Sequence, residues 1–140
     1  MDSLLRMLKR QEGVSKFAYE DHLGYITVGV GRCLDPEMGL GLSDDEINYL
    51  LRNDIERCYS ELSVFSWFYD LNQTRQEALV SMLFQLGLTK FLGFKKALKY
   101  IAEGKYEQAA KEMLDSRWAE QTPNRANEIS YMIETGQYAH

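Results

Sequence analysis

The sequence has few of the residues that mark disulfide-rich and metal-binding proteins. Its 140 residues include two cysteines, two histidines and two prolines. Cys33 and Cys58 are too few for a disulfide scaffold and too far apart for the close pairs of a structural zinc site. His22 and His140 are also far apart, so they give no ligand cluster in the sequence. We therefore expect reduced thiols, no metal and no other cofactor.

An excess of basic charge and long apolar runs are also missing. Sixteen Lys and Arg against 21 Asp and Glu give a net charge of −5, which excludes a global basic field for nucleic acid or anionic membrane but not a local basic patch. The densest apolar stretch, 79–88, contains Ser81, Gln85 and Gly87, so it is no membrane span. The start, MDSLLRMLKRQEG, lacks the apolar block of a secretory signal. We expect no nucleic-acid partner, no membrane insertion and a cytoplasmic location until release.

What is present is the composition of a globular protein. Hydrophobic residues make up 45% and charged residues 26% of the chain, and both values are ordinary. A chain of this length buries roughly 68–70% of its extended surface on folding. That is enough for one compact unit or for two lobes that share a core.

The apolar pattern changes period within the first part of the chain. Residues 3–11 place apolar side chains on one side of a helix that Gly13 ends. The segment 16–30, KFAYEDHLGYITVGV, is rich in β-forming residues and is interrupted by Asp-His-Leu-Gly. This pattern predicts two short strands around a turn. The glycine-rich segment up to Leu42 predicts irregular structure with room for one more short strand.

Helical signals dominate the rest of the chain. Ser43-Asp-Asp-Glu46 is a capping box that opens a long helix through Cys58. Because the strands are segregated from the helices, the pattern predicts an α+β fold, with a long helix between a small β lobe and a larger helical lobe, and a cleft between the lobes. Further helices are predicted from Thr74-Arg-Gln-Glu77, a second capping box, to Leu86, over 94–103, over 106–114, and from Thr122-Pro123 to Gly136.

Three polar residues of the front segment are candidates for chemistry. Glu12 ends the first helix, Asp21 lies at the turn of the predicted hairpin, and Thr27 lies in its second strand. Hairpin pairing brings Thr27 back towards Asp21, and Gly13 keeps Glu12 close to the first strand. Two carboxyl groups of this kind suit the cleavage of a glycosidic bond, which needs one proton donor and one ionised carboxylate.

Taken alone, each of these residues also has an ordinary structural interpretation. A glutamate before a glycine is usually a solvated helix end, and an aspartate in a turn usually bonds its own backbone. Threonine is common in strands. Spacing alone therefore leaves both interpretations open.

The amino acids around these three residues are more informative than the spacing alone. The stretch EGVSKFAYEDHLGYITVGVGR, residues 12–32, resembles the phage-type lysozymes of glycoside hydrolase family 24, and Glu12, Asp21 and Thr27 reproduce the spacing of that family's triad. MLFQLG at 82–87 and SRWAEQTPNRA at 116–126 are similar to two later blocks of the family. Three blocks in the family's order cover most of the chain.

The resemblance implies a lysozyme-like fold over 1–140. Its parts would be a small β lobe, 13–42, a bridging helix, 43–62, and a helical lobe from 1–12 and 63–140, with the active site in the cleft between the lobes. The implied activity is that of a muramidase, which hydrolyses the β-1,4 bond between N-acetylmuramic acid and N-acetylglucosamine in peptidoglycan, with inversion at the anomeric carbon.

The resemblance also implies roles for particular residues. Glu12 would be the general acid, Asp21 would position or activate water, and Thr27 would help to hold that water. Arg125 matches an arginine that approaches the catalytic glutamate in relatives. Arg32 replaces a histidine whose partner is an aspartate at the position of Asp54, so we expect an ion pair between Arg32 and Asp54. The expected glycan contacts are Cys33, Phe84, Gln85, Ala97, Glu112 and Arg117.

Two non-enzymatic alternatives stay open at this stage. A wall-binding or structural module of a phage would keep the fold without the reaction, although the intact triad argues against it. A helical partner-binding domain has only the generic helices in its favour. If the protein is an endolysin, it is a monomer that acts on peptidoglycan strands, and a separate holin-like protein gives it access to the wall. A transglycosylase is the nearest enzymatic alternative.

Overall fold

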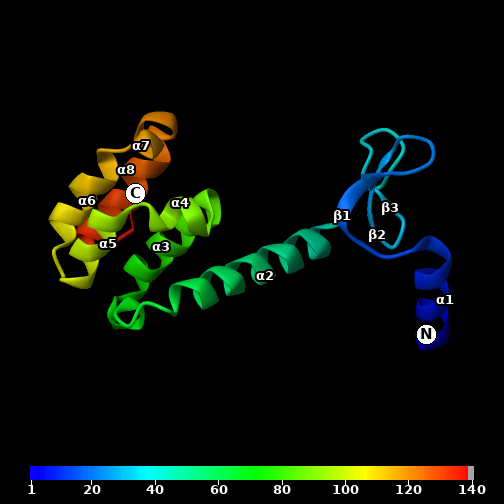
Figure 1. The fold of residues 1–140 in the computed structure, drawn as a ribbon, viewed down its shortest axis with the longest axis horizontal. Helices are drawn as coiled ribbons and strands as arrows, with labels where there is room; N and C mark the ends of the chain where they lie inside the picture. Colours follow the sequence, from blue (N-terminus) through cyan, green and yellow to red (C-terminus); the bar gives the residue numbers. More distant parts are fainter. Residues whose placement is uncertain (139–140) are drawn as a thin grey trace. The chain divides into compact units, whose positions relative to one another are not determined.

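The computed structural model describes residues 1–138 and divides the chain into two compact units, 1–50 and 51–140. The first unit contains a helix, α1 (Asp2–Glu12), and three strands, β1 (Ser15–Glu20), β2 (Ile26–Gly29) and β3 (Arg32–Cys33). Helix α2 (Asp44–Leu62) begins in the first unit and ends in the second. The ribbon in Figure 1 follows these elements in chain order from blue to red.

The first unit is built on a small antiparallel sheet. The strand order is β1-β2-β3, with Tyr19 opposite Thr27 and Thr27 opposite Cys33. The register of β1 against β2 shifts between Ser15 and Tyr19, so the pairing of the two strands is irregular there. The predicted hairpin at 16–30 is confirmed, and β3 occupies the segment where the sequence left room for a short strand.

Helix α2 begins as its capping box predicts. The backbone N–H of Ser43 donates to Oε1 of Glu46 at 2.8 Å, and the backbone N–H of Glu46 donates to Oγ of Ser43 at 3.2 Å. These two bonds satisfy amide groups that a helix start otherwise leaves without partners. The helix then continues to Leu62, as expected.

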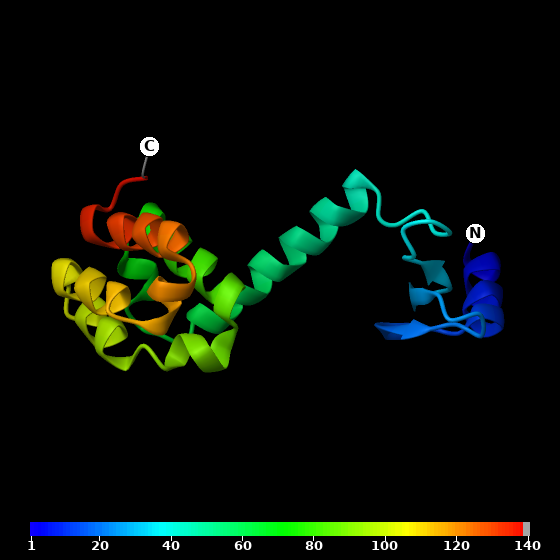
Figure 2. The ribbon, with the colours of Figure 1, turned by 90° about the horizontal axis from the view of Figure 1, so that it is seen from above.

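The second unit is helical and contains the apolar core. The elements after α2 are a 3-10 helix (Phe68–Asp70), α3 (Gln73–Leu86), α4 (Leu88–Leu92), α5 (Lys95–Ala102), α6 (Tyr106–Leu114), α7 (Arg117–Gln121) and α8 (Pro123–Thr135). Helix α8 packs against α3, α6 and α7, and α5 packs against α6 (Figure 2). The large side chains that are fully buried come from α2 and from most of the later elements: Leu62, Phe68, Leu79, Met82, Phe91, Met113 and Ile133.

One predicted helix start is wrong. Helix α3 begins before the second capping box, with Asn72 as its N-cap residue, and Oδ1 of Asn72 accepts from the backbone N–H of Arg75 at 3.0 Å. Asn72 is favoured because its side-chain amide also donates to the carbonyl of Gly136 at 3.0 Å, at the end of α8. This tertiary bond is invisible in the local sequence pattern. The short helices α4 and α7 and the 3-10 helix were not predicted, although Ser116 caps α7, with its Oγ accepting from the backbone N–H of Ala119 at 3.2 Å.

The α+β fold class is confirmed by three strands confined to the front of a mostly helical chain. Helix α1 belongs to the first unit, while the expected grouping of 1–12 with the helical lobe stays a prediction. Among the described residues, none of the helices has the length and apolar character needed to cross a bilayer.

Candidate active site

A pocket of about 340 Å³ in the first unit is lined by all three residues of the predicted triad. Glu12 comes from the end of α1, Asp21 from the turn after β1, and Thr27 from β2. The other residues that line it are Tyr19, Glu20, His22, Gly31 and Cys33.

The sheet register places Thr27 at this pocket. Tyr19, Thr27 and Cys33 are direct cross-strand neighbours on β1, β2 and β3, and directly opposed residues point to the same face of a sheet. Thr27 is 4% exposed and is the one buried residue within 1–50. Its Oγ1 donates to the carbonyl of Tyr25 at 3.1 Å, so the hydroxyl position is fixed by the backbone.

The carboxylate of Asp21 is held by the turn that follows β1. The backbone N–H groups of Leu23 and Tyr25 each donate to Oδ1 of Asp21 at 2.9 Å. Gly24, with φ of +87°, supplies the left-handed conformation that closes the turn. The hydrogen bond from Tyr25 is the largest cause that lowers the pKa of Asp21, while desolvation opposes it. Asp21 is therefore an ionised group at neutral pH.

Glu12 enters the pocket because a glycine lies opposite it. Helix α1 ends at Gly13, whose N–H donates to the carbonyl of Lys9 at 2.9 Å. A Cβ atom built on Gly31 would lie 3.0 Å from Oε2 of Glu12 and 3.5 Å from its Cδ. Gly31 also has a φ of +68°. This position thus favours glycine twice, once for its backbone conformation and once for the approach of Glu12.

Four pocket residues were not among the sequence-predicted site residues: Tyr19, Glu20, His22 and Gly31. Glu20 and His22 flank Asp21 in the chain, and the charge interaction with His22 is one of the smaller causes that lower the pKa of Asp21. Their signal in the sequence was simply their position next to Asp21. Tyr19 could have been found from strand periodicity, since it lies opposite Thr27 in the hairpin register.

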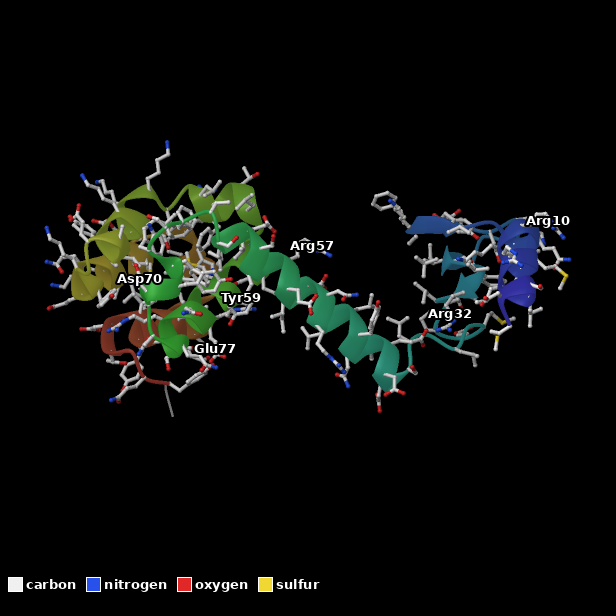
Figure 3. The ribbon with its side chains drawn as sticks, turned by 90° about the horizontal axis from the view of Figure 1, so that it is seen from below. Arg10, Arg32, Arg57, Tyr59, Asp70 and Glu77 are labelled. Carbon is white, nitrogen blue, oxygen red and sulfur yellow. The ribbon has the colours of Figure 1, made fainter. Side chains whose placement is uncertain are left out.

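Arg32 does not have the partner that the sequence predicted. Its Nη1 lies 2.7 Å from the carboxylate of Glu46 and donates to the carbonyl of Gly41 at 3.1 Å. Asp54 instead lies 3.1 Å from Nη2 of Arg57. Figure 3 labels Arg32 and Arg57. Glu46 is in the first turn of α2, while Asp54 is eight residues later, roughly 12 Å along the helix axis at 1.5 Å per residue.

The other predicted contacts lie in the second unit. Ala97, Glu112 and Arg117 line a pocket of about 720 Å³ there. Phe84 is 44% exposed. Gln85 accepts from Nε1 of Trp118 at 2.8 Å and donates to Oγ1 of Thr122 at 3.4 Å. Arg125 donates through Nη2 to the carbonyl of Ser81 at 2.9 Å and to its Oγ at 3.0 Å.

The pocket of the first unit contains the groups that general acid–base catalysis of bond cleavage requires. It offers one carboxyl group at a helix end, a second carboxylate held ionised by backbone amides, and a fixed hydroxyl. Across residues 1–138, no group of three or more His, Cys, Asp or Glu side chains has the arrangement of a metal site.

Comparisons with known proteins agree on one family. The model of the "Phage lysozyme" family matches residues 9–129. "Probable T4-type lysozyme 1" of Dictyostelium discoideum is 32% identical over 97% of this chain and 96% of its own length. The endolysin of Salmonella phage P22 is 30% identical over 74% of this chain and 73% of its own.

A structural protein of a phage is similar as well. The pre-baseplate central spike protein Gp5 of Enterobacteria phage T4 is 28% identical over 96% of this chain, but the match covers 28% of Gp5. The family match extends over most of the chain and includes the helix end, hairpin and glycine-rich turns that form the pocket. The chain belongs to the phage lysozyme family.

Proposed function

We propose that the protein hydrolyses the β-1,4 bond between N-acetylmuramic acid and N-acetylglucosamine in bacterial peptidoglycan. The observation that carries this proposal is the meeting of Glu12, Asp21 and Thr27 at one pocket in a member of the phage lysozyme family. Relatives named lysozyme or endolysin support the same activity.

In the proposed reaction Glu12 donates a proton to the leaving glycosidic oxygen. This role needs a carboxyl group that is protonated when the bond breaks, and burial under a bound glycan favours the protonated form. We also propose that Arg125 supports the reaction, as its match to an arginine near the catalytic glutamate of relatives implies. A positive charge near the acid would stabilise the carboxylate that Glu12 becomes once it has donated its proton.

Asp21 and Thr27 act on the water in this scheme. Asp21 is ionised, because backbone amides lower its pKa, so it can accept a proton or stabilise positive charge on the sugar. The hydroxyl of Thr27 has a backbone acceptor in Tyr25, which leaves its oxygen lone pairs to accept from a water. We propose inversion at the anomeric carbon, as the resemblance to the family implies. Inversion requires space for a water between Asp21 and the sugar, and the pocket of about 340 Å³ exceeds the roughly 30 Å³ that a water occupies in the liquid.

The substrate contacts are part of the same proposal. Cys33 lies in the pocket of the triad, and Ala97, Glu112 and Arg117 line the pocket of the second unit. Phe84 and Gln85 complete the proposed set of glycan contacts. In an infected bacterium the enzyme would act as a monomeric endolysin that causes lysis once a holin-like protein has opened a path to the wall.

The similarity to Gp5 favours a second candidate, a wall-binding module of a phage particle. Such a module would bind peptidoglycan without cleaving it. The two candidates differ in whether new ends form in the polymer.

The test is hydrolysis of purified peptidoglycan by the wild type, Glu12→Gln and Glu37→Gln. Glu37 is exposed and lies outside the pocket, so Glu37→Gln is the matched control. We expect new reducing ends at muramic acid with the wild type and the control. Glu12→Gln should lower the hydrolysis rate by a factor of about 100 or more, the usual scale for a lost general acid. Hydrolysis that survives Glu12→Gln would remove Glu12 from its role, and anhydro products would indicate a transglycosylase.

A further inference from the structure

The pocket in the second unit gathers positive charge in an otherwise acidic chain. The chain carries a net charge of −5, yet this pocket of about 720 Å³ is lined by more cations than carboxylates. The positively charged lining residues are Lys90, Lys95, Lys96 and Arg117, and the negatively charged ones are Glu112 and Asp115.

These cations are not used elsewhere in the described part of the chain. Lys105 and Lys111 form ion pairs with Glu103 and Glu107, whereas the four cations of the pocket have no ion-pair partner within residues 1–138. Positive side chains around a concave surface raise the local concentration of anions. Their charge is therefore available to a ligand.

Part of the pocket lining is apolar and well packed. Ala97 is 2% and Trp118 5% exposed, and the ring of Phe94 meets Trp118 edge to face with centroids 5.8 Å apart. Nε1 of Trp118 is already bonded to Gln85, so the polar end of this side chain is satisfied. The pocket volume falls in the range of small-molecule sites, about 300–1,000 Å³. It therefore has room for a sugar ring and not only for a lone oxyanion.

We propose that this pocket binds a sugar that carries a phosphate ester. Three of the four cations are lysines, which hold phosphate as point charges, and the planar fork of the fourth, Arg117, also suits phosphate oxygens. A phosphate monoester carries about −1.5 to −2 charges at neutral pH, and the lining has four cations against two carboxylates. The charges of ligand and pocket thus match.

We assign the bound phosphate to a phosphorylated glycan of the bacterial wall, and this identity of the ligand rests on the proposed function. The affinity for phosphate is independent of the proposed function, because it follows from Lys90, Lys95 and Lys96, which the proposed hydrolysis does not use. A phosphate site of this kind would make the enzyme select wall segments that bear phosphate.

The first test measures binding to the full chain by calorimetry at low ionic strength. The probes are N-acetylglucosamine 1-phosphate, N-acetylglucosamine and a muramyl dipeptide, which carries a free carboxylate but no phosphate. We expect the phosphorylated sugar to bind at least about tenfold more tightly than either other probe, and added salt to weaken it through screening. Equal binding of the plain sugar, tighter binding of the dipeptide, or no binding of the sugar phosphate would overturn the proposal.

The matched variants are Lys95→Gln with Lys96→Gln, and Lys16→Gln with Lys99→Gln as control. All four lysines are exposed, both variants lose the same charge, and Lys16 and Lys99 do not line the pocket. We expect the first variant to bind the sugar phosphate about tenfold more weakly and the control to change less than about twofold. Equal weakening in both would mean a general charge effect and would refute the site. Melting temperatures check that both variants are folded.

A second arm identifies the source of the phosphate. Glu12→Gln protein is sedimented with intact bacterial walls and with walls whose phosphate esters have been removed by hydrofluoric acid. Binding that falls with phosphate removal supports a wall glycan, and unchanged binding together with tight sugar phosphate binding supports a soluble sugar phosphate. If the wild type fails to hydrolyse walls but still binds the sugar phosphate, the proposed function fails and the pocket stands.

Discussion

Each of the two units of this protein is stabilised internally by a different kind of interaction. In residues 1–50 the one buried residue is Thr27, whereas the second unit buries a continuous apolar core. The first unit takes its shape from glycines with positive φ, from the turn around Asp21 and from the capping box of α2. The proposed catalytic triad thus lies in the unit that buries little, and the apolar core lies in the other, so we expect substitutions in the triad to cost little stability.

Removing one phenyl ring from each unit gives the largest expected contrast. Phe91 is fully buried in the second unit and Phe17 is 79% exposed in the first. Phe91→Ala should lower the free energy of unfolding by about 3–5 kcal/mol, and Phe17→Ala by no more than about 0.5 kcal/mol. Urea unfolding followed by circular dichroism measures both, and the fluorescence of Trp67 and Trp118 reports the second unit alone. Equal losses of unfolding free energy in the two variants would contradict the conclusion that the apolar core lies in the second unit.

Two glycines of the first unit separate backbone strain from placement of the acid. Gly31 and Gly41 have similar φ values, +68° and +63°, but only at Gly31 would a Cβ meet Glu12, while at Gly41 it meets nothing within 4 Å. Gly31→Ala and Gly41→Ala should each cost about 1–2 kcal/mol of strain. Hydrogen exchange of the sheet amides measures this cost.

The same pair sharpens the assignment of Glu12. We expect Gly31→Ala to lower the hydrolysis rate at least about tenfold further than Gly41→Ala, because displacement of a catalytic group by even 1 Å is costly. Identical rates in the two variants would show that the position of Glu12 above Gly31 has no role in the reaction.

The smallest expected effect concerns the ion pair at the start of α2. The hydrogen bond from Arg32 is the main cause that lowers the pKa of Glu46 from 4.5 to about 2. A carboxylate with a lowered pKa in the folded state stabilises the fold above its unfolded pKa, and this contribution is lost as the pH falls through the folded value. Stability from this pair should therefore be lost between about pH 4.5 and pH 2.

Replacement of the arginine tests this pair. Melting temperatures at pH 6 and pH 3 should differ less in Arg32→Gln than in the wild type. Arg57→Gln, which removes the partner of Asp54, is the control and should keep the wild-type difference. Since Arg32 and Glu46 are both partly exposed, the shift is small. A wild-type pH response in Arg32→Gln would contradict the assigned pair.

Most of the secondary structure could be predicted from local sequence patterns. The Ser43–Glu46 box, Gly13 and the Thr122-Pro123 pair act within a few residues, and the elements that they bound lie where the sequence predicts them. The same holds for the hairpin, whose register carries Thr27 to the pocket. These signals work because caps and turns satisfy backbone groups close in sequence.

The failures came from partners far away in sequence. Asn72 caps α3 while its amide also holds the carbonyl of Gly136, 64 residues later. Arg32 binds Glu46 rather than Asp54 because Gly41 and the capping box bring the first turn of α2 to it. The expected pair with Asp54 was carried over from a histidine of relatives, and the longer arginine side chain reaches a different carboxylate.

The most direct test of the account is Asp21→Asn, because Asp21 serves both the turn and the proposed reaction. Asparagine keeps an Oδ1 acceptor for the N–H groups of Leu23 and Tyr25, which bond Oδ1 of Asp21 at 2.9 Å, and it is equally suited to such turns. The variant therefore removes the charge and keeps the turn. Peptidoglycan hydrolysis should fall about 100-fold or more with an unchanged melting temperature. Wild-type hydrolysis by Asp21→Asn would contradict the account and leave Asp21 with a structural role alone.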